Sequence, residues 1–280
     1  MSLVFTTTSC DMDLTPDSAV PEHEALRTID DCDAWVVGIY SAFKNSALYS
    51  GYMTLLPDIQ ADMAYAALNT NNGFYTNIYQ WDIKSTTDEI IAVYNGLYTI
   101  VARCNFFLDY KDQVEVNLKT TADKDNFKKR LGEVYFARAM AYAELIRLFC
   151  EPMTSVNADT ENMGICLPTT YRDDVPKVKR STLRESYNQI ISDLKSAEDN
   201  LPDSRTVADS HYFSKGAVYA LRARIYMYMG MGDLKRDRNN EYLKKSVEAA
   251  TKVIKLGVYE LSDAINNAFV IDSKYYTDYQ

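Results

Sequence analysis

The segment between residues 62 and 82 interleaves planar aromatic rings with amide and carboxylate side chains. Strong turn residues at 69–73 place the segment in a loop between helices. Aromatic faces stack on the C–H groups of a sugar ring, and fixed amides and carboxylates hydrogen-bond to its hydroxyl groups. The segment is therefore suited to carbohydrate recognition. The alternative is a packed loop in which Trp81 and Tyr79 fill a gap between helices.

Motifs for catalysis are missing from the sequence. It has no glycine-rich phosphate loop and no G-x-S-x-G nucleophile elbow, and its two histidines, His23 and His211, are too few for a histidine relay. Aspartates cluster within 30–33 and at 173–174, but a glycosidase needs two carboxylates that face each other across a cleft. Adjacent aspartates usually cap helices or are solvated. We therefore expect no catalytic residues, no metal and no cofactor.

The amino-terminal region contains a cysteine that could carry a lipid. Cys10 follows a short stretch of apolar and small residues and precedes a polar segment, 11–16. This order is similar to the end of a bacterial lipoprotein signal, although the apolar run at 3–5 is short and no basic residue precedes it. The alternative is an ordinary free thiol near the chain terminus. No run reaches the ~18 apolar residues of a membrane span, so membrane attachment would use the lipid.

Composition favours a helical protein with an acidic surface. The 280 residues are 47% hydrophobic, and they include ten glycines and seven prolines, too few for a loop-rich barrel. The net charge of −9 and the lack of a long basic tract make nucleic acid an unexpected partner. The five cysteines lack zinc or redox spacing, and their odd number leaves at least one outside any disulfide.

Apolar residues at steps of three and four predict a series of amphipathic helices. The expected helices span 28–47, 86–108, 124–150, 182–201, 213–229 and 241–256. Capping boxes are expected at Thr86 with Glu89 and at Thr182 with Glu185. The helices at 86–108 and 124–150 are expected to form an antiparallel pair, and a tetratricopeptide-like hairpin is considered for the last two helices.

Several stretches, taken in order, resemble the SusD/RagB family of outer-membrane nutrient-binding lipoproteins. They are Ser9–Pro16, Val37–Phe43, Val93–Asn105, Gly132–Ala139, Ser181–Pro202 and Ser214–Arg224. The resemblance implies an all-α fold of tetratricopeptide-like helix pairs with long irregular loops. It also implies a lipoprotein signal remnant and polar tether at 1–27, and a SusD-like helical domain over 28–280 that is truncated at its carboxyl end.

For function, the resemblance implies a cell-surface lipoprotein, anchored to the outer membrane by a lipid on Cys10 and without catalytic activity. Such proteins capture oligosaccharides, or sometimes peptides, and pass them to a SusC-like TonB-dependent transporter. The resemblance also suggests which residues of the 62–82 segment meet the ligand. The expected stacking platforms are Trp81, Tyr79 and Tyr75, and the expected hydroxyl partners are Asn69, Asn71 and Asp62.

Two other functions stay open at this stage. A helical-repeat adaptor would bind a protein partner and would not depend on Trp81. An all-α glycosidase would release sugar slowly and would depend on one of the aspartates.

Overall fold

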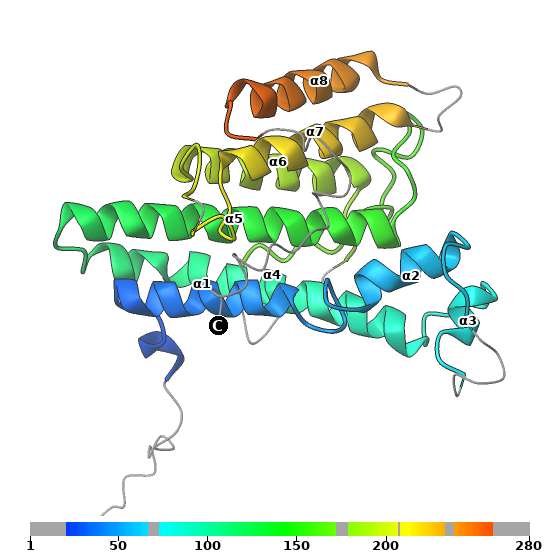
Figure 1. Cartoon of the computed structure of the whole chain (residues 1–280), viewed down its shortest axis with the longest axis horizontal. Helices are drawn as coiled ribbons and strands as arrows, with labels where there is room; N and C mark the ends of the chain where they lie inside the picture. The colour runs from blue at the N-terminus through cyan, green and yellow to red at the C-terminus, as the bar shows by residue number, and fades with distance from the viewer. Residues whose placement is uncertain (1–20, 67–72, 172–178, 207, 233–237, 260–280) are drawn as a thin grey trace, which may run out of the picture. The chain divides into compact units, whose positions relative to one another are not determined.

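The computed structural model describes residues 21–66, 73–171, 179–206, 208–232 and 238–259 (Figure 1). The chain runs through η1 (Glu22–Glu24), α1 (Ile29–Phe43), α2 (Tyr52–Gln60), α3 (Thr76–Tyr79), α4 (Asp88–Glu115), α5 (Thr121–Phe149), α6 (Leu183–Asn200), α7 (Lys215–Met231) and α8 (Asn240–Lys255). These ranges contain no β-strand, and one isolated antiparallel bridge pairs Cys166 with Arg180. The expected all-α fold is confirmed.

The chain divides into two compact units. The first comprises Met1–Val134 with Pro168–Pro176, and the second comprises Tyr135–Leu167 with Lys177–Gln280. The boundary falls inside α5, between Val134 and Tyr135. The single helical domain expected over 28–280 stays a prediction.

In the first unit, α1 packs along α4 (Figure 1). Thr28 and Asp31 form a capping box, in which the Asp31 N–H donates to the Thr28 hydroxyl at 3.2 Å and the Thr28 N–H donates to the Asp31 carboxylate at 2.8 Å. The buried residues of α1 recur at steps of three and four, as the sequence predicts. They are Cys32, Val36, Ile39 and Phe43.

The start of α5 turns back on the end of α4 within the same unit. The rings of Phe107 and Phe127 stack with their centroids 6.2 Å apart, and the connection at 116–120 is short. This contact agrees with the expected antiparallel pair. α4 is also long and apolar enough to cross a membrane by length and composition. Its Val93, Leu97 and Ile100 are buried against other parts of the protein, which is typical of an apolar core helix.

The predicted start of α4 is wrong by about one residue. α4 begins at Asp88 with Thr87 as its N-cap, so Thr86 and Glu89 do not form the expected capping box. The hydroxyl of Thr87 instead accepts a hydrogen bond from the Lys84 N–H at 3.0 Å. The Thr87 hydroxyl is therefore used in the preceding turn and does not cap α4.

The region between 48 and 86, where no helix was expected, contains α2 and α3. α2 is nine residues long and has Pro57 inside it, which explains why the sequence did not predict this helix. Its Leu56 and Ile59 are buried with Ile78 of α3, and this small cluster holds the two helices together. A side chain at Gly51, the N-cap of α2, would overlap the carbonyl oxygen of Ser46.

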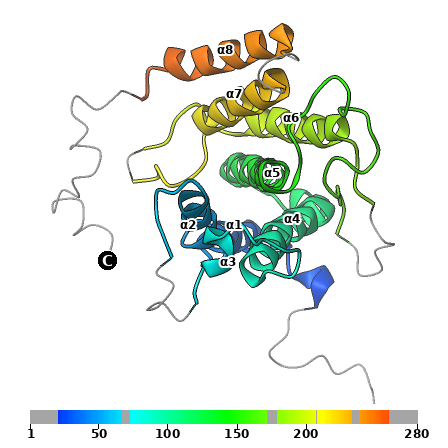
Figure 2. The same ribbon diagram turned by 90° about the vertical axis from the view of Figure 1, so that its right-hand side faces the viewer.

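In the second unit, α6, α7 and α8 pack in sequence, each against the next (Figure 2). The capping box predicted at Thr182 and Glu185 is confirmed, with hydrogen bonds of 2.8 and 3.1 Å between the two residues. Gly257 has a φ of 66° directly after the last turn of α8, as expected for a glycine that ends a helix.

A buried ion pair joins the second part of α5 to α6. The guanidinium of Arg138 donates to both carboxylate oxygens of Asp193, at 2.9 and 2.7 Å. Gln189 donates to the same carboxylate at 3.1 Å. Both charged side chains are almost inaccessible to water, so each depends on the other for solvation.

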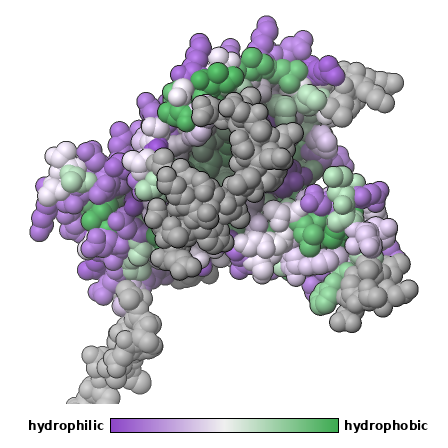
Figure 3. All heavy atoms as spheres, viewed as in Figure 1, coloured by the Kyte–Doolittle hydropathy of each residue, from purple (hydrophilic) through white to green (hydrophobic). Residues whose placement is uncertain are grey.

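The predicted core face of α8 is largely exposed. Among the residues of this helix Ala249 is buried, whereas 66% of Val247 and 78% of Ile254 remain accessible. Figure 3 shows hydrophobic side chains gathered along this helix. The helix meets α7 through other side chains: the Ser246 hydroxyl, for example, donates to the Ala223 carbonyl at 2.7 Å.

The chain after α8 returns to the start of α7. The hydroxyl groups of Tyr259 and Ser214 lie 3.0 Å apart, and the Tyr259 ring covers Gly216. A Cβ atom at position 216 would overlap that ring. Gly216 therefore provides the space that Tyr259 occupies.

Candidate ligand-binding segment

Among the described residues of the 62–82 segment, three that are not glycine adopt the left-handed backbone conformation. The φ angles are 57° at Asp62, 59° at Tyr75 and 58° at Trp81. This conformation is uncommon for a residue with a side chain, and it is strained for bulky aromatic residues. Strained positions of this kind gather at binding and catalytic sites, where the surrounding structure holds them.

Tyr75 and Tyr79 lie on the small hydrophobic cluster of α2 and α3. Both are half-buried against Leu56, Ile59 and Ile78. The ring of Tyr75 also meets the ring of Tyr52 edge-on, with centroids 6.1 Å apart. These two tyrosines therefore serve partly as packing, which was the alternative reading of the loop.

Trp81 is different, because 64% of its surface is accessible. It ends the turn after α3, where its N–H donates to the carbonyl of Ile78 at 3.2 Å. The backbone is thus tied to the hydrophobic cluster while the side chain extends into solvent. The alternative in which Trp81 fills a gap between helices is therefore wrong for this residue.

Three other apolar side chains are exposed in the described part of this segment and were not predicted as site residues. Met63, Tyr65 and Phe74 are each more than three-fifths accessible. Exposed aromatic residues are enriched at recognition surfaces. Sequence patterns could not identify them, since the exposed and the packed tyrosines occur within a few positions of each other.

The structure describes part of the predicted polar set. Asp62 is exposed directly after α2, and its N–H donates to the Ile59 carbonyl at 3.3 Å. Asn69 and Asn71 lie outside the described residues. The hydroxyl of Thr76, beside Tyr75, is buried and has no hydrogen-bond partner among the residues described.

Most buried carboxylates are paired with arginine. Glu133 binds Arg130 at 3.0 Å, and Glu144 binds the neighbouring Arg147 at 2.6 Å. Asp33 also binds Arg130, at 2.5 Å, and Asp31 caps α1. Asp31 and Asp33 thus have structural roles, in agreement with the expectation from the sequence, while the aspartates at 173–174 lie outside the described residues.

Hydrogen bonds explain the lowered pKa of Asp31. Burial alone would raise this pKa, but hydrogen bonds from the backbone of Arg27 and from Thr28 outweigh burial and lower it from 3.8. In the described part of the chain, no group of three His, Cys, Asp or Glu side chains could hold a metal ion.

Comparisons with known proteins agree with the helical architecture. SusD-like protein P2 of Formosa agariphila is 22% identical over 230 residues, which are 81% of this chain and 42% of that protein. A SusD homolog from Bacteroides thetaiotaomicron has a TM-score of 0.72 at 21% identity, covering 89% of this chain and 44% of that one. A laminarin-binding SusD-like protein has a TM-score of 0.67 at 18% identity, and the match covers 89% of this chain and 50% of that one. The chain spans about half the length of these relatives, or slightly less.

A family sequence profile matches a longer part of the chain. The SusD-like profile described as "Starch-binding associating with outer membrane" matches residues 12–227. The match begins after Cys10, so lipidation of this cysteine stays a prediction. Because the match covers most of the chain and the helices superpose on solved structures of this superfamily, the chain belongs to the SusD/RagB family.

Proposed function

We propose that this chain binds oligosaccharides at the bacterial cell surface and that the 62–82 segment contributes the binding surface. The observation that carries the proposal is Trp81, an exposed indole whose left-handed backbone is anchored on a packed cluster. The names of the relatives, which include a laminarin-binding protein, support the same ligand class.

In the proposed complex, the ring of Trp81 stacks on a pyranose face. Tyr75 and Tyr79 present their accessible edges beside it. The Asp62 carboxylate accepts hydrogen bonds from the sugar hydroxyls, and the side-chain amides of Asn69 and Asn71 accept or donate them. Because the backbone at Trp81 is already fixed, little conformational entropy is lost when a glycan binds.

The proposal extends to location and partner. A lipid on Cys10 would hold the protein at the outer membrane, and a SusC-like TonB-dependent transporter would receive the oligosaccharide. The family description supports an association with the outer membrane. We propose that the protein acts without catalysis, because the described aspartates near α1 are engaged in capping and ion pairing.

Calorimetric titration with laminarin, starch, xyloglucan and host-type oligosaccharides tests this function. We expect one glycan class to bind, and Trp81→Ala to weaken that binding about tenfold, which corresponds to ~1.4 kcal/mol of lost stacking. The thermal midpoint should change little, since Trp81 is mostly exposed.

Tyr94→Ala is the matched control, because Tyr94 is an accessible aromatic residue on α4 outside the segment. This variant should bind the glycan like the unmodified protein. Equal weakening by both variants, or cooperative unfolding with no glycan bound at millimolar concentration, would contradict the proposal.

One observation favours the second candidate, a protein-binding adaptor. The accessible Val247 and Ile254 of α8 form an apolar surface of the kind that partner proteins cover. An adaptor would bind its protein partner equally well with and without Trp81. Turnover of a glycan that depends on one aspartate would instead favour a glycosidase.

A further inference from the structure

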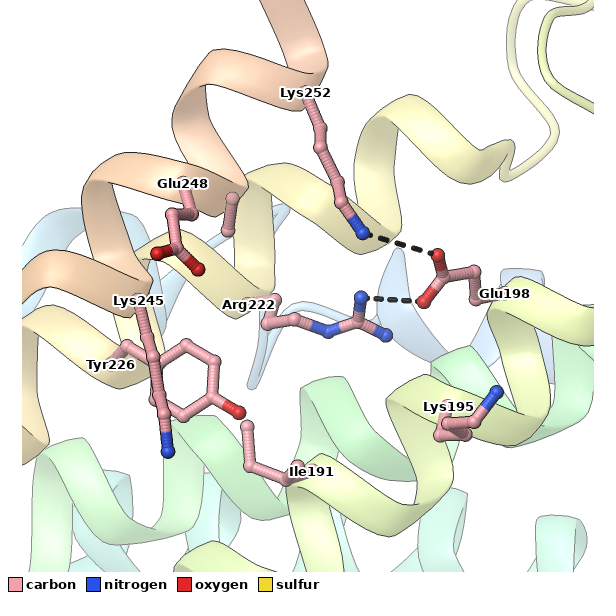
Figure 4. Close-up of a pocket in the computed structure, with 9 residues that line it drawn as sticks. Ile191, Lys195, Glu198, Arg222, Tyr226, Lys245, Glu248 and Lys252 are labelled. Carbon is pink, nitrogen blue, oxygen red and sulfur yellow. Dashed lines mark hydrogen bonds and ion pairs between the residues drawn. The ribbon is translucent and has the colours of Figure 1, made fainter. Parts of the chain in front are cut away.

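A pocket in the second unit lies between α6, α7 and α8 and has a volume of 320 Å³ (Figure 4). This size is at the lower end of the range for small-molecule sites, about 300–1,000 Å³. Six of the nine residues that line it are charged, and Ile191 and the ring of Tyr226 form an apolar side. The remaining lining residues are Lys195, Glu198, Arg222, Lys245, Glu248, Ala249 and Lys252.

Tyrosine rings hold two of the lysines. The Lys252 ammonium lies 5.0 Å from the centroid of Tyr219. The Lys245 ammonium lies 5.8 Å from the centroid of Tyr226 and 5.6 Å from that of Tyr242. Cation–π contacts of this length are attractive, so they restrict where the two charges can be. Lys245 forms no ion pair with a carboxylate in the described ranges.

The floor of the pocket is fixed by Arg222 and Glu198. One nitrogen of Arg222 donates to Glu198 at 2.5 Å, and another donates to the Leu194 carbonyl at 3.0 Å. Lys252 lies 3.6 Å from the other oxygen of Glu198. Burial alone would raise the pKa of Glu198, but the hydrogen bond from Arg222 outweighs it, so this pKa is lowered and Glu198 is ionised at neutral pH.

The charge balance of the pocket is opposite to that of the whole chain. Its lining has four cations and two carboxylates, and it stays positive when Asp199, which binds Lys195 at 3.0 Å, is included. The chain as a whole has a net charge of −9. Because salt screens charges beyond about 8–10 Å, the local excess decides which ligands are attracted.

From this arrangement, we propose that the pocket between α6, α7 and α8 binds the carboxylate of a small acidic sugar, with Lys245 contacting the carboxylate and Tyr226 packing against the sugar ring. A carboxylate accepts hydrogen bonds from ammonium and guanidinium groups, which the pocket supplies. Tyr226 and Ile191 give the apolar surface that an isolated inorganic anion would not need. This site is separate from the 62–82 segment and shares none of its residues.

The test is an NMR titration of the full chain with glucuronate, with glucose as the neutral match and inorganic sulfate as the bare anion. We expect glucuronate to shift amide signals of α7 and α8, and glucose to leave them unchanged. Lys245→Glu should weaken glucuronate binding at least about fivefold, whereas Glu248→Gln should strengthen it, because each substitution changes the charge that faces the ligand.

Lys244→Glu is the matched control, since Lys244 is adjacent on α8 but does not line the pocket. It makes the same change in net charge and should leave glucuronate affinity within about twofold. If Lys245→Glu does not fold, as judged by circular dichroism, the salt dependence of glucuronate binding to the unmodified protein decides the question. Binding that does not weaken between low and high salt would overturn the proposal.

Three further results would also overturn it. Glucose could shift the same signals as strongly as glucuronate, which would show that the carboxylate does not contribute to binding. Sulfate could bind as tightly as glucuronate, which would remove the role of Tyr226. Lys244→Glu and Lys245→Glu could have equal effects, which would indicate a general response to net charge. None of these results involves Trp81, so they are independent of the oligosaccharide proposal.

Discussion

At the scale of single residues, the pair of Arg138 and Asp193 shows how burial makes two charges depend on each other. Their two hydrogen bonds, at 2.9 and 2.7 Å, replace water around both groups. Removing one partner leaves the other charge buried without compensation, which costs more than the pair itself contributes. The effect of a substitution here therefore depends on which charges remain.

We expect Arg138→Met to lower the free energy of unfolding by about 3–5 kcal/mol, because Asp193 stays buried. The double variant Arg138→Met with Asp193→Leu should recover a large part of this loss. Urea unfolding followed by circular dichroism measures both. A double variant that is less stable than Arg138→Met would contradict this account.

The sequence could not predict which side chains of the candidate site are buried and which are exposed. Tyr79 and Trp81 are two positions apart, yet one packs on the α2–α3 cluster and the other extends into solvent. The difference depends on the left-handed turn at Trp81, which tertiary contacts stabilise. A pattern of residue types contains no information about such a turn, so the sequence could propose the segment as a candidate but could not predict the orientation of its rings.

At the scale of helices, the capping boxes show when a local sequence motif is sufficient to predict where a helix begins. The pair Thr182 and Glu185 forms the predicted box, and Thr28 with Asp31 forms another. The pair Thr86 and Glu89 has the same spacing and fails, because the adjacent Thr87 is the N-cap. Local spacing therefore predicts the cap only where no neighbouring residue competes.

We expect Asp31→Asn to destabilise the protein at pH 7 by about 0.5 kcal/mol, through the loss of a charged group at the start of α1. The pKa of Asp31 is lower in the folded state than its ordinary value of 3.8, so its contribution is complete above that value. The contribution is lost as the pH falls through the folded-state pKa.

Urea midpoints at pH 7 and at about pH 2.5 measure this change. The difference between Asp31→Asn and the unmodified protein should shrink at the lower pH. Asp30→Asn, in the same first turn but outside the capping box, is the control and should have a smaller effect at pH 7. A difference for Asp31→Asn that stays constant with pH would contradict the prediction.

Substitutions in α8 can test whether the apolar face of this helix is packed against the protein. Its periodicity predicted a core face, but Ile254 is 78% exposed in the described structure. Ile254→Ser should therefore change the free energy of unfolding by less than about 0.5 kcal/mol, since little apolar area is lost from the interior. Ile225→Ser on α7, where the isoleucine is buried, should cost several times more. If chemical denaturation gave equal losses of unfolding free energy for Ile254→Ser and Ile225→Ser, Ile254 would be buried and the prediction would be wrong.

At the scale of the whole molecule, the all-α class was predictable, because the six long helices in the described ranges each have a strong period and few interruptions. α2 was not, since it is short and contains Pro57. The pocket between α6, α7 and α8 was also beyond prediction, because its cations come from three helices, of which the sequence pairs only the last two. Long-range contacts of this kind appear only after folding.

Gly216 has a consequence for the path of the polypeptide. Since this residue lacks a methyl group, the ring of Tyr259 can lie against the first turn of α7, with its hydroxyl 3.0 Å from that of Ser214. The chain that leaves α8 is thereby turned back on itself rather than carried onward in the direction of the helix. The position of Tyr259 is thus set by the absence of one carbon atom at Gly216, forty-three positions earlier in the sequence.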